Sequence, residues 1–454
     1  MTAPKAWTRR EFLRGSLMTA GALSARSTLG LLAGTTATLA APTDYRALVC
    51  IFLAGGSDGY NLLVPTDPHR YATYAASRRN LALPADKLLP LTGVLEANQP
   101  YGLHPAAPGL RDLFNSGRLA FAVNAGTLLQ PTSKRDYLNG VKLPPQLFSH
   151  NDQSDQWMAS QPDAQQRVGW GGLIADHLTK RNGASPLPLG ISIAGNNLFQ
   201  TGLIKVPYIV GTNGVDRLYV VSGNPNDQRS NLFKKILNTA ALSGRLLQKE
   251  YAKTIKASLD LQATLNEALR NGSIGSGPWP YNWLSAQLQM VAKLISLRQT
   301  LGMSRQVFFV TLGGWDTHDD QLDRHADLLA QLSGSVASFH AAMDEFGVGD
   351  AVTSFTLSDF GRTLTSNGDG TDHAWGNIHC VAGGGVVGGK LYGAFPDLAI
   401  DGPDDAGFGR LIPTTSVEQY AATLARWFGV TDADLPTIFP HLSRFPVQDL
   451  GFME

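Results

Sequence analysis

The densest group of chemically active residue types lies in two neighbouring motifs, SDFGRT at residues 358–363 and GTDHAWGNIH at residues 370–379. Their candidate site residues are Asp359, Arg362, Asp372, His373 and His379. Carboxylate oxygens and imidazole nitrogens are metal donors, and an arginine can hold an anion through two parallel hydrogen bonds. The cluster therefore predicts a metal or anion site, although an Asp359–Arg362 ion pair beside an ordinary turn would also explain it.

A second motif, GGWDTHDDQ at residues 313–321, places Asp316 and His318 two positions apart. Both side chains could bind one divalent ion, and a carboxylate with an imidazole suits zinc, manganese or iron better than calcium. The alternative is that Asp316 or a neighbour caps the following helix while His318 is solvated. His325 falls on an apolar stripe, so we expect a core histidine there.

Asp58 lies in a third motif, GGSDGYN at residues 55–61, which directly follows an apolar run. The glycines would let the backbone approach an ion or a substrate closely, which makes Asp58 a candidate metal ligand. Gly-Ser-Asp-Gly is also an ordinary turn sequence in which the aspartate caps its own backbone.

Ser149 in FSHNDQSDQW, residues 148–157, is the candidate nucleophile. A serine at a helix N-terminus lies beside free backbone N–H groups, which would stabilise its alkoxide and the anion that it attacks. A coordinated metal would lower the pKa of this hydroxyl further. The adjacent His150 is a candidate general acid. Because Ser149 and Asp152 also resemble a capping box, an ordinary N-cap is the alternative.

Short β-branched or aromatic runs alternate with amphipathic segments along the chain, which predicts an α/β fold with a largely parallel central sheet flanked by helices. The predicted strands are 47–53, 119–124, 189–194, 307–312, 352–357 and 379–382, and the clearest predicted helices are 281–301, 320–346 and 417–428. Ser416, Gln419 and Gly429 supply a capping box and a terminator for the last helix. Most motifs directly follow a strand, so we expect them to meet beyond the carboxyl ends of the strands.

A nearly continuous helical stretch without a strand signal runs over about 227–303, broken at 272–280 by glycine, serine and proline. It predicts a helical insertion within a single domain that spans residues 44–454.

The composition indicates a globular protein without a polyanionic partner. Thirty-seven basic residues balance 37 acidic ones, and neither sign forms a long run, so nucleic acid and anionic membrane surfaces are not expected partners. A small neutral or anionic ligand is favoured instead. Cys50 and Cys380 lie in strand-like runs, where we expect burial; they could pair in an oxidising compartment only if their strands were neighbours.

The N-terminus resembles a twin-arginine signal peptide, assigned to residues 1–40, in which Arg9 and Arg10 precede a mostly apolar stretch. Arg26 and several glycines make this stretch a poor membrane span. We expect cleavage after Ala40, while cleavage after Ala25 or retention as an anchor remain alternatives. The interpretation predicts export by the twin-arginine translocase, a folded protein in the periplasm or cell envelope, and no stable membrane span in the mature form.

In combination the motifs resemble the bacterial domain-of-unknown-function 1501 (DUF1501) family over nearly the whole mature chain. The motifs that carry the resemblance are GGSDGYN, LHPA at 103–106, FSHNDQSDQW, GGWDTHDDQ, SDFGRT, and TDHAWGNIHCVAGGGVVGGKLYG at 371–393. That family in turn resembles the alkaline phosphatase and sulfatase superfamily, whose members hydrolyse phosphate or sulfate esters, or isomerise phosphosugars, with one or two divalent metals. This resemblance implies an alkaline-phosphatase-like fold.

The superfamily resemblance also implies roles for individual residues. Its metal ligands would be matched by Asp58, Asp316, His318, Asp359 and His373. Ser149 would be the nucleophile. Phe360 stands where the superfamily pattern has a histidine after the aspartate at 359, so a second metal would lose a ligand.

Two functional hypotheses follow. In the first, the protein is an exported metal-dependent hydrolase of phosphate or sulfate esters, in which Ser149 attacks, one or two divalent ions are bound, and Arg362 or His379 steadies the transferred group. In the second, it is a catalytically inactive superfamily member that binds an envelope glycan or a partner protein. Phe360 favours the second hypothesis. The retained acidic ligands favour the first, because unpaired buried carboxylates are costly.

Overall fold

The computed structural model describes residues 44–454 except 94–98, 164–166, 184, 217 and 223. The predicted signal peptide, residues 1–40, lies outside the described residues. Among the described helices, none combines the length and apolar character needed to cross a membrane. The described residues form two compact units, of which the larger comprises Asp44–Gly214 and Gly272–Glu454.

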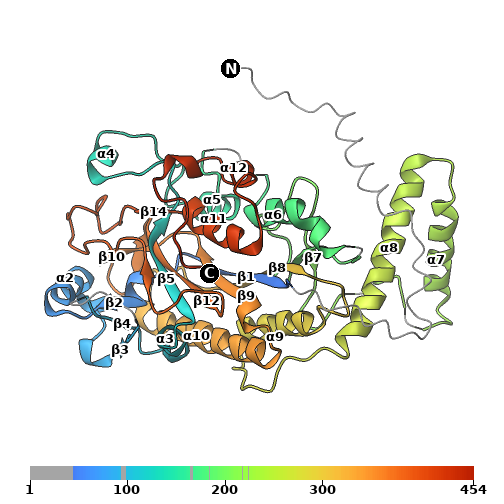
Figure 1. Ribbon diagram of the computed structural model, residues 1–454, viewed down its shortest axis with the longest axis horizontal. Helices are drawn as coiled ribbons and strands as arrows, with labels where there is room; N and C mark the ends of the chain where they lie inside the picture. Colours follow the sequence, from blue (N-terminus) through green and yellow to red (C-terminus); the bar gives the residue numbers. More distant parts are fainter. Residues whose placement is uncertain (1–43, 94–98, 164–166, 184, 217, 223) are drawn as a thin grey trace. The chain divides into compact units, whose positions relative to one another are not determined.

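The larger unit is built on a nine-stranded sheet (Figure 1). The strand order is β13 (Leu391–Tyr392), β5 (Leu119–Gly126), β12 (Asn377–Gly383), β9 (Val352–Ser358), β1 (Arg46–Ala54), β8 (Arg305–Gly313), β6 (Gly190–Ser192) and β7 (Tyr208–Ile209), with β14 (Thr415–Ser416) beside β5. Strand β12 runs antiparallel to β5 and β9, and the other described pairings in this sheet are parallel. The predicted largely parallel α/β sheet is confirmed.

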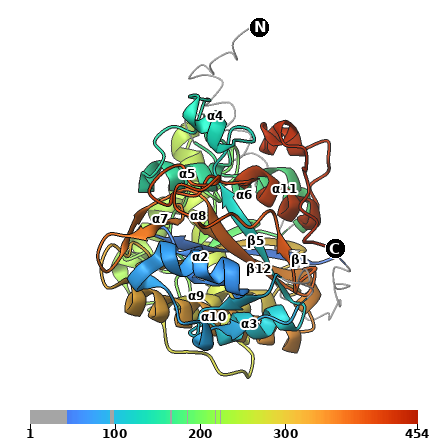
Figure 2. The same ribbon diagram turned by 90° about the vertical axis from the view of Figure 1, so that its left-hand side faces the viewer.

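Helices cover both faces of this sheet (Figure 2). One face carries α5 (His150–Ala159), α6 (Trp170–Leu178) and α11 (Val417–Phe428), and the other carries α3 (Pro108–Asn115), α9 (Trp283–Ser296) and α10 (Gln321–Glu345). Alternate residues of β1, Leu48, Cys50 and Phe52, join the core under α5, α6 and α11. Because successive strand side chains point to opposite faces, both faces of the central strands are buried.

The caps predicted for α11 are confirmed. The hydroxyl of Ser416 accepts the backbone N–H of Gln419, whose side chain accepts the backbone N–H of Ser416 in return. Gly429 ends the helix with a φ of 114°, a left-handed conformation that suits glycine.

Both cysteines are buried and unpaired. Cys50 lies on β1 and Cys380 on β12, and β9 separates these two strands in the sheet. A disulfide between them is therefore excluded, as expected if both thiols serve only as small buried side chains.

Smaller elements complete the larger unit. A three-stranded sheet contains β2 (Leu63–Pro65), β4 (Tyr101–Leu103) and β3 (Leu89–Pro90), and a two-stranded sheet contains β10 (Arg362–Ser366) and β11 (Thr371–His373). The further helices are α2 (Pro68–Arg78), α4 (Lys134–Leu138) and α12 (Leu435–Ile438). The 3₁₀ helices are η1 (Gly59–Asn61), η2 (Arg79–Leu81), η3 (Ala85–Lys87), η4 (Thr179–Asn182), η5 (Gly349–Ala351) and η6 (Leu442–Arg444).

The second compact unit comprises the described part of Val215–Asn271. Its helices α7 (Gln228–Ala241) and α8 (Leu246–Leu269) pack side by side as a hairpin (Figure 1). The helical insertion predicted over about 227–303 covers this hairpin and also α9, which packs on β8 and α10 within the larger unit.

The strands that precede the predicted site motifs end at one edge of the main sheet. Ala54 at the end of β1 lies opposite Gly313 at the end of β8, and Leu53 lies opposite Ser358 at the end of β9. Strand β12 is antiparallel to β9 and so begins at this same edge, with Asn377. The segments that follow β1, β8 and β9 and the segment that precedes β12 therefore meet at this edge of the sheet.

Candidate metal centre

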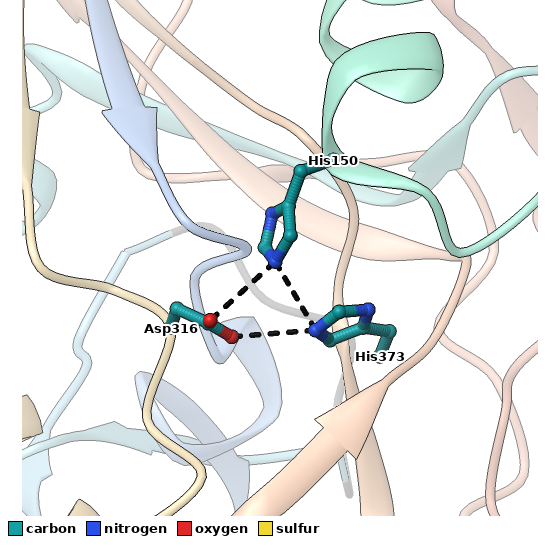
Figure 3. A group of neighbouring side chains, drawn as sticks. All are labelled: His150, Asp316 and His373. Carbon is teal, nitrogen blue, oxygen red and sulfur yellow. Dashed lines mark hydrogen bonds and ion pairs between the residues drawn. The ribbon is translucent and has the colours of Figure 1, made fainter.

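Three side chains from separate segments point toward one another at this edge (Figure 3). His150 is the first residue of α5, Asp316 follows β8, and His373 ends β11. The Nε2 atom of His150 lies 3.1 Å from Nε2 of His373 and 3.5 Å from Oδ2 of Asp316, and Nε2 of His373 lies 3.3 Å from Oδ1 of Asp316. These donors could hold one metal ion.

The second ring nitrogen of each of these histidines faces an oxygen. Nδ1 of His150 lies 2.6 Å from Oδ2 of Asp359, and Nδ1 of His373 lies 2.8 Å from the backbone carbonyl of Phe148. An oxygen acceptor places the hydrogen on Nδ1, which leaves the lone pair of a neutral imidazole on Nε2. Burial lowers the pKa of His373 and so favours its neutral form.

Two lone pairs therefore face each other across 3.1 Å, between His150 and His373. Such an arrangement is repulsive unless a proton or a metal ion lies between the nitrogens. A tetrahedral zinc ion with bonds of about 2.0–2.1 Å would hold its donors about 3.3 Å apart, which agrees with the separations among His150, Asp316 and His373. The outward oxygen contacts match the second shell that fixes metal-binding histidines. The donor set therefore fits a divalent ion.

His318 borders this group on its solvent side. Its Nε2 lies 3.0 Å from Oδ1 of Asp316 and 2.9 Å from Nε2 of His373, and its Nδ1 lies 3.3 Å from Oδ1 of Asp372. The side chain of His318 is 41% exposed, against 24% for His373. Among the four residues, Asp372 is 57% exposed, Asp316 44% and His318 41%, so these three side chains border solvent.

Arg362 positions Asp316. Its guanidinium is buried, and Nη1 lies 2.8 Å from Oδ1 of Asp316, while Nη2 and Nε donate to the carbonyl and hydroxyl of Thr371 at 2.5 and 3.2 Å. Burial alone would raise the pKa of Asp316, but its hydrogen bond and charge interaction with Arg362 outweigh this and lower it. Arg362 was expected to hold a substrate anion; instead its donors are used inside the protein.

Asp359 was expected to bind metal directly, and it instead orients His150. Both of its carboxylate oxygens accept the backbone N–H of Gly55 at 3.2 Å, in addition to the contact with His150. Gly55 has a φ of 120°, and a Cβ there would lie 2.4 Å from the backbone nitrogen of Asp316. Only glycine lets this turn pass between the two aspartates.

Asp58, also an expected ligand, is engaged elsewhere. It is buried and forms an ion pair with Arg78 of α2 through Oδ1. Oδ1 also accepts the backbone N–H of Asn61 at 3.2 Å, and Oδ2 accepts the amide of Gln321 at 2.6 Å. Asp58 thus links η1, α2 and α10, and the described contacts do not bring it to the His150 group.

His379 was expected to steady the phosphate or sulfate group of the ester. Its side chain instead lies in the core. It points from β12 toward Trp157, with ring centroids 4.5 Å apart, and its Nδ1 lies 3.3 Å from the hydroxyl of Thr356. Among the described residues, its Nε2 has no hydrogen-bond partner. Burial lowers the pKa of His379 to about 3, so this imidazole is neutral at neutral pH.

Ser149 lies at the start of α5 between Phe148, which contacts His373, and His150, which belongs to the candidate metal-binding group. The carbonyl of Phe148 accepts from His373, and Phe148 has a left-handed φ of 72° that an aromatic residue rarely adopts. The hydroxyl of Ser149 donates to Oδ2 of Asp152 at 2.6 Å. It makes no capping bond to the helix backbone, so the alternative of an ordinary N-cap does not describe it.

Phe360 packs directly against the imidazoles of His150 and His373. Its ring centroid lies 4.8 Å from that of His150 and 4.6 Å from that of His373, and the side chain is fully buried. The position where the resemblance implied a further histidine is thus occupied by an apolar ring.

Arg410 was not identified from the sequence. Its Nε donates to the backbone carbonyl of His373 at 3.1 Å, and its guanidinium lies over the rings of Phe148 and Phe408, at 4.9 and 5.4 Å from their centroids. Among the described residues, its Nη1 and Nη2 have no hydrogen-bond or ion-pair partner. The one sequence signal is that Arg410 follows Phe-Gly, as Arg362 does.

Solved structures similar to the chain include a sulfatase, a periplasmic domain and a synthase. The PsFucS1 sulfatase from Pseudoalteromonas sp. is 12% identical, with a TM-score of 0.37 over 98% of this chain and 78% of the sulfatase. The C-terminal periplasmic domain of EcEptC from Escherichia coli, in complex with Zn, is 10% identical, with a TM-score of 0.31 over 75% of this chain and 73% of that domain. The lipoteichoic acid synthase LtaP from Listeria monocytogenes is 8% identical, with a TM-score of 0.33 over 86% of this chain and 73% of the synthase.

A comparison with curated proteins finds no match. Residues 45–435 match the family described as "Protein of unknown function (DUF1501)". This match includes every motif on which the sequence resemblance rested. Because it covers most of the chain, the protein belongs to the DUF1501 family.

Proposed function

We propose that this protein is a metal-dependent hydrolase of phosphate or sulfate esters in which His150, Asp316 and His373 bind one divalent ion. The observation that carries the proposal is the direction of the two imidazoles, whose Nδ1 atoms contact oxygens while their Nε2 atoms converge near Asp316. Two nitrogens and a carboxylate oxygen favour zinc, manganese or iron over calcium.

The contacts favour one ion rather than two. Phe360 covers one side of the imidazole pair, and both oxygens of Asp58 and of Asp359 are already hydrogen-bonded. Three protein ligands leave an open position, which is typical of catalytic sites. When bound, the ion would supply Lewis acidity toward an ester oxygen and would lower the pKa of a neighbouring hydroxyl.

In this proposal Ser149 is the nucleophile and Asp152 is its base. As Oγ of Ser149 forms a bond to the phosphorus or sulfur of the ester, its proton passes to the Asp152 carboxylate 2.6 Å away, and the bond to the ester oxygen breaks. An oxygen of water then forms a bond to the phosphorus or sulfur, the bond to Oγ of Ser149 breaks, and phosphate or sulfate leaves while the proton on Asp152 returns to Oγ. The contacts of Phe148 and His150 with the metal-binding group hold the intervening serine at its border.

Two further side chains would act on the substrate. His318 contacts a carboxylate through each ring nitrogen and borders solvent, so its protonated form can give a proton to the departing ester oxygen. The unused Nη groups of Arg410 can donate to the anionic oxygens of the ester. The ester class itself rests on the motif order, which resembles that of the alkaline phosphatase and sulfatase superfamily.

The proposal extends to location and partners. The arginine pair ahead of an apolar, glycine-rich stretch supports export by the twin-arginine translocase to the periplasm or cell envelope. There the protein would meet a small anionic ester or an envelope glycan that carries one.

The test combines metal content with turnover in the purified protein. Plasma mass spectrometry is expected to give about one equivalent of a transition metal in the wild type and in Ser149→Ala, and little in Asp316→Ala. Hydrolysis of 4-nitrophenyl phosphate or 4-nitrophenyl sulfate is expected only in the wild type.

Three results would decide against parts of this proposal. Absence of metal even after reconstitution with zinc or manganese would overturn it. Metal binding without hydrolysis of either ester class would favour the second hypothesis, a protein that binds an envelope glycan or a partner. Undiminished turnover in Ser149→Ala would exclude the serine mechanism.

A further inference from the structure

The α7–α8 hairpin exposes large apolar side chains around its connecting loop. We define the hairpin tip as residues 242–251. Within it Leu242 is 87% exposed, Leu246 53%, Leu247 73% and Tyr251 69%. Leu247 and Tyr251 are one helical turn apart on α8 and so share a face. Leu242 lies directly after α7, so the exposed side chains come from both sides of the turn.

The apolar face continues along α7. Leu232 and Ile236 are also one turn apart and are 60% and 55% exposed. The opposite side of the helix carries the buried Ser230 and Leu237, which pack within the unit. One face of α7 therefore packs in the unit, while Leu232 and Ile236 lie on its exposed face.

Basic residues predominate in the sequence of the hairpin. Between Gln228 and Ser258 the chain has seven lysines or arginines and a single acidic residue, Glu250, although the whole chain is neutral. Glu250 already pairs with Lys253, at 3.2 Å. In the part of the chain that the structure describes, the side chains of Arg245 and Lys249 in the hairpin tip form no ion pair, so their charges are available to an external partner.

We propose that the hairpin tip docks on the surface of an anionic phospholipid bilayer. Leucine and tyrosine side chains would enter the boundary between headgroups and acyl chains, while Arg245 and Lys249 would contact lipid phosphates. A tip that carries exposed apolar side chains together with unpaired cations is complementary to such a surface in both polarity and charge. A soluble protein partner would have to bring matching acidic groups.

This inference revises an expectation from composition. An anionic membrane was not expected as a partner because 37 basic residues balance 37 acidic ones over the whole chain and neither sign forms a long run. The hairpin has a local excess of basic residues that this overall balance does not reveal. The proposed mode of contact is peripheral, through the exposed side chains of the hairpin tip. It does not depend on the proposed hydrolase activity.

The experiment is co-sedimentation of the purified full chain with vesicles of phosphatidylcholine alone or of phosphatidylcholine and phosphatidylglycerol in equal parts. The wild type is expected to bind the mixed vesicles and to be released as salt rises. Leu246→Ser with Leu247→Ser, and separately Arg245→Gln with Lys249→Gln, should each weaken binding by about tenfold or more. Leu138→Ser on α4, where the leucine is 70% exposed in the larger unit, is the matched control and should bind like the wild type.

Because all four substituted tip residues lie at the surface of the hairpin, the variants should keep the thermal transition of the wild type. Failure of the wild type to bind mixed vesicles would overturn the proposal. So would equal binding to both vesicle types with no loss in either double variant. Sedimentation velocity without lipid measures the oligomeric state. If the wild type is a dimer and Leu246→Ser with Leu247→Ser is a monomer, the partner of this face is a second copy of the chain and the membrane proposal is overturned.

Discussion

Nδ1 of His150 lies 2.6 Å from Oδ2 of Asp359, and this contact aims the other nitrogen of the ring at Asp316 and His373. The aspartate is held in turn by the backbone N–H of Gly55. Asp359, which the motif pattern implies as a ligand, therefore contacts a residue of the candidate metal site through the far side of its imidazole ring.

Asp359→Asn should weaken metal binding by about 10–100-fold without abolishing it, because the amide orients the imidazole less firmly than the carboxylate does. Competition with a chromogenic chelator measures the change. Asp319→Asn, at an exposed aspartate in the same loop as Asp316, serves as the control. Complete loss of metal in Asp359→Asn would instead make Asp359 a direct ligand.

Arg78→Met should destabilise the protein by about 3–5 kcal/mol, because it leaves the buried Asp58 without its cation. Chemical denaturation followed by tryptophan fluorescence gives this value. The metal content of the folded fraction should stay at the wild-type level, because the described contacts of Asp58 lie outside the His150 group. Loss of metal in folded Asp58→Asn would contradict this assignment.

If Arg410 holds the ester anion, Arg410→Ala should raise KM about tenfold or more while kcat changes less, since a charged hydrogen bond to the bound substrate is lost. Arg410→Lys should recover part of the affinity. Steady-state kinetics on the ester that the wild type hydrolyses provides the measurement. Arg324→Ala, which removes an arginine that pairs with Asp319, should leave both constants unchanged.

His379 predicts a pH dependence of stability. Burial lowers its pKa in the folded protein to about 3, whereas the unfolded chain protonates near the ordinary value of about 6.5. Above that value both states are neutral and His379 contributes nothing to the pH dependence. As the pH falls from about 6.5 toward 3, only the unfolded state gains the proton, so stability falls by up to about 1.4 kcal/mol per pH unit.

His379→Phe and His379→Gln should both make the decline of unfolding free energy with acid shallower, whatever each does to the absolute stability. Urea denaturation at several pH values between neutral and mildly acidic gives the slope. An unchanged slope in both variants would mean that this imidazole becomes protonated in the folded protein.

Arg9→Lys together with Arg10→Lys should retain the protein in the cytoplasm, because the translocase reads the arginine pair. Fractionation of cells that express the wild type or the double variant, followed by immunoblotting, measures the distribution. Equal amounts of both proteins in the periplasmic fraction would mean that export uses another route.

The sequence predicted the sheet and the edge at which the motifs gather, because apolar runs bounded by glycine and acidic turns mark strand ends. It did not predict which side chains at that edge point inward together. His379 illustrates the limit: it belongs to a motif of the site, yet the alternation of side chains along β12 directs it into the core against Trp157.

The contacts of Asp58 could not be predicted for a different reason. Its partner Arg78 is twenty positions away on α2, and a local motif contains no information about how that helix packs against η1. Arg410 escaped notice because it reaches the centre only through the backbone of His373 and the ring of Phe148. Contacts between distant segments, rather than residue types, decide these roles.

His150, Asp316 and His373 belong to three segments that are far apart in sequence and adjacent only in the folded chain. A bound ion would therefore act as a cross-link among these segments and would be acquired only by a folded protein. If the twin-arginine translocase carries the chain already folded, the choice among zinc, manganese and iron is made in the cytoplasm, before the protein meets the metals of the envelope. The identity of the bound ion would then reflect the metals available in the cytoplasm, where the chain is synthesised, rather than those in the envelope, where it would function.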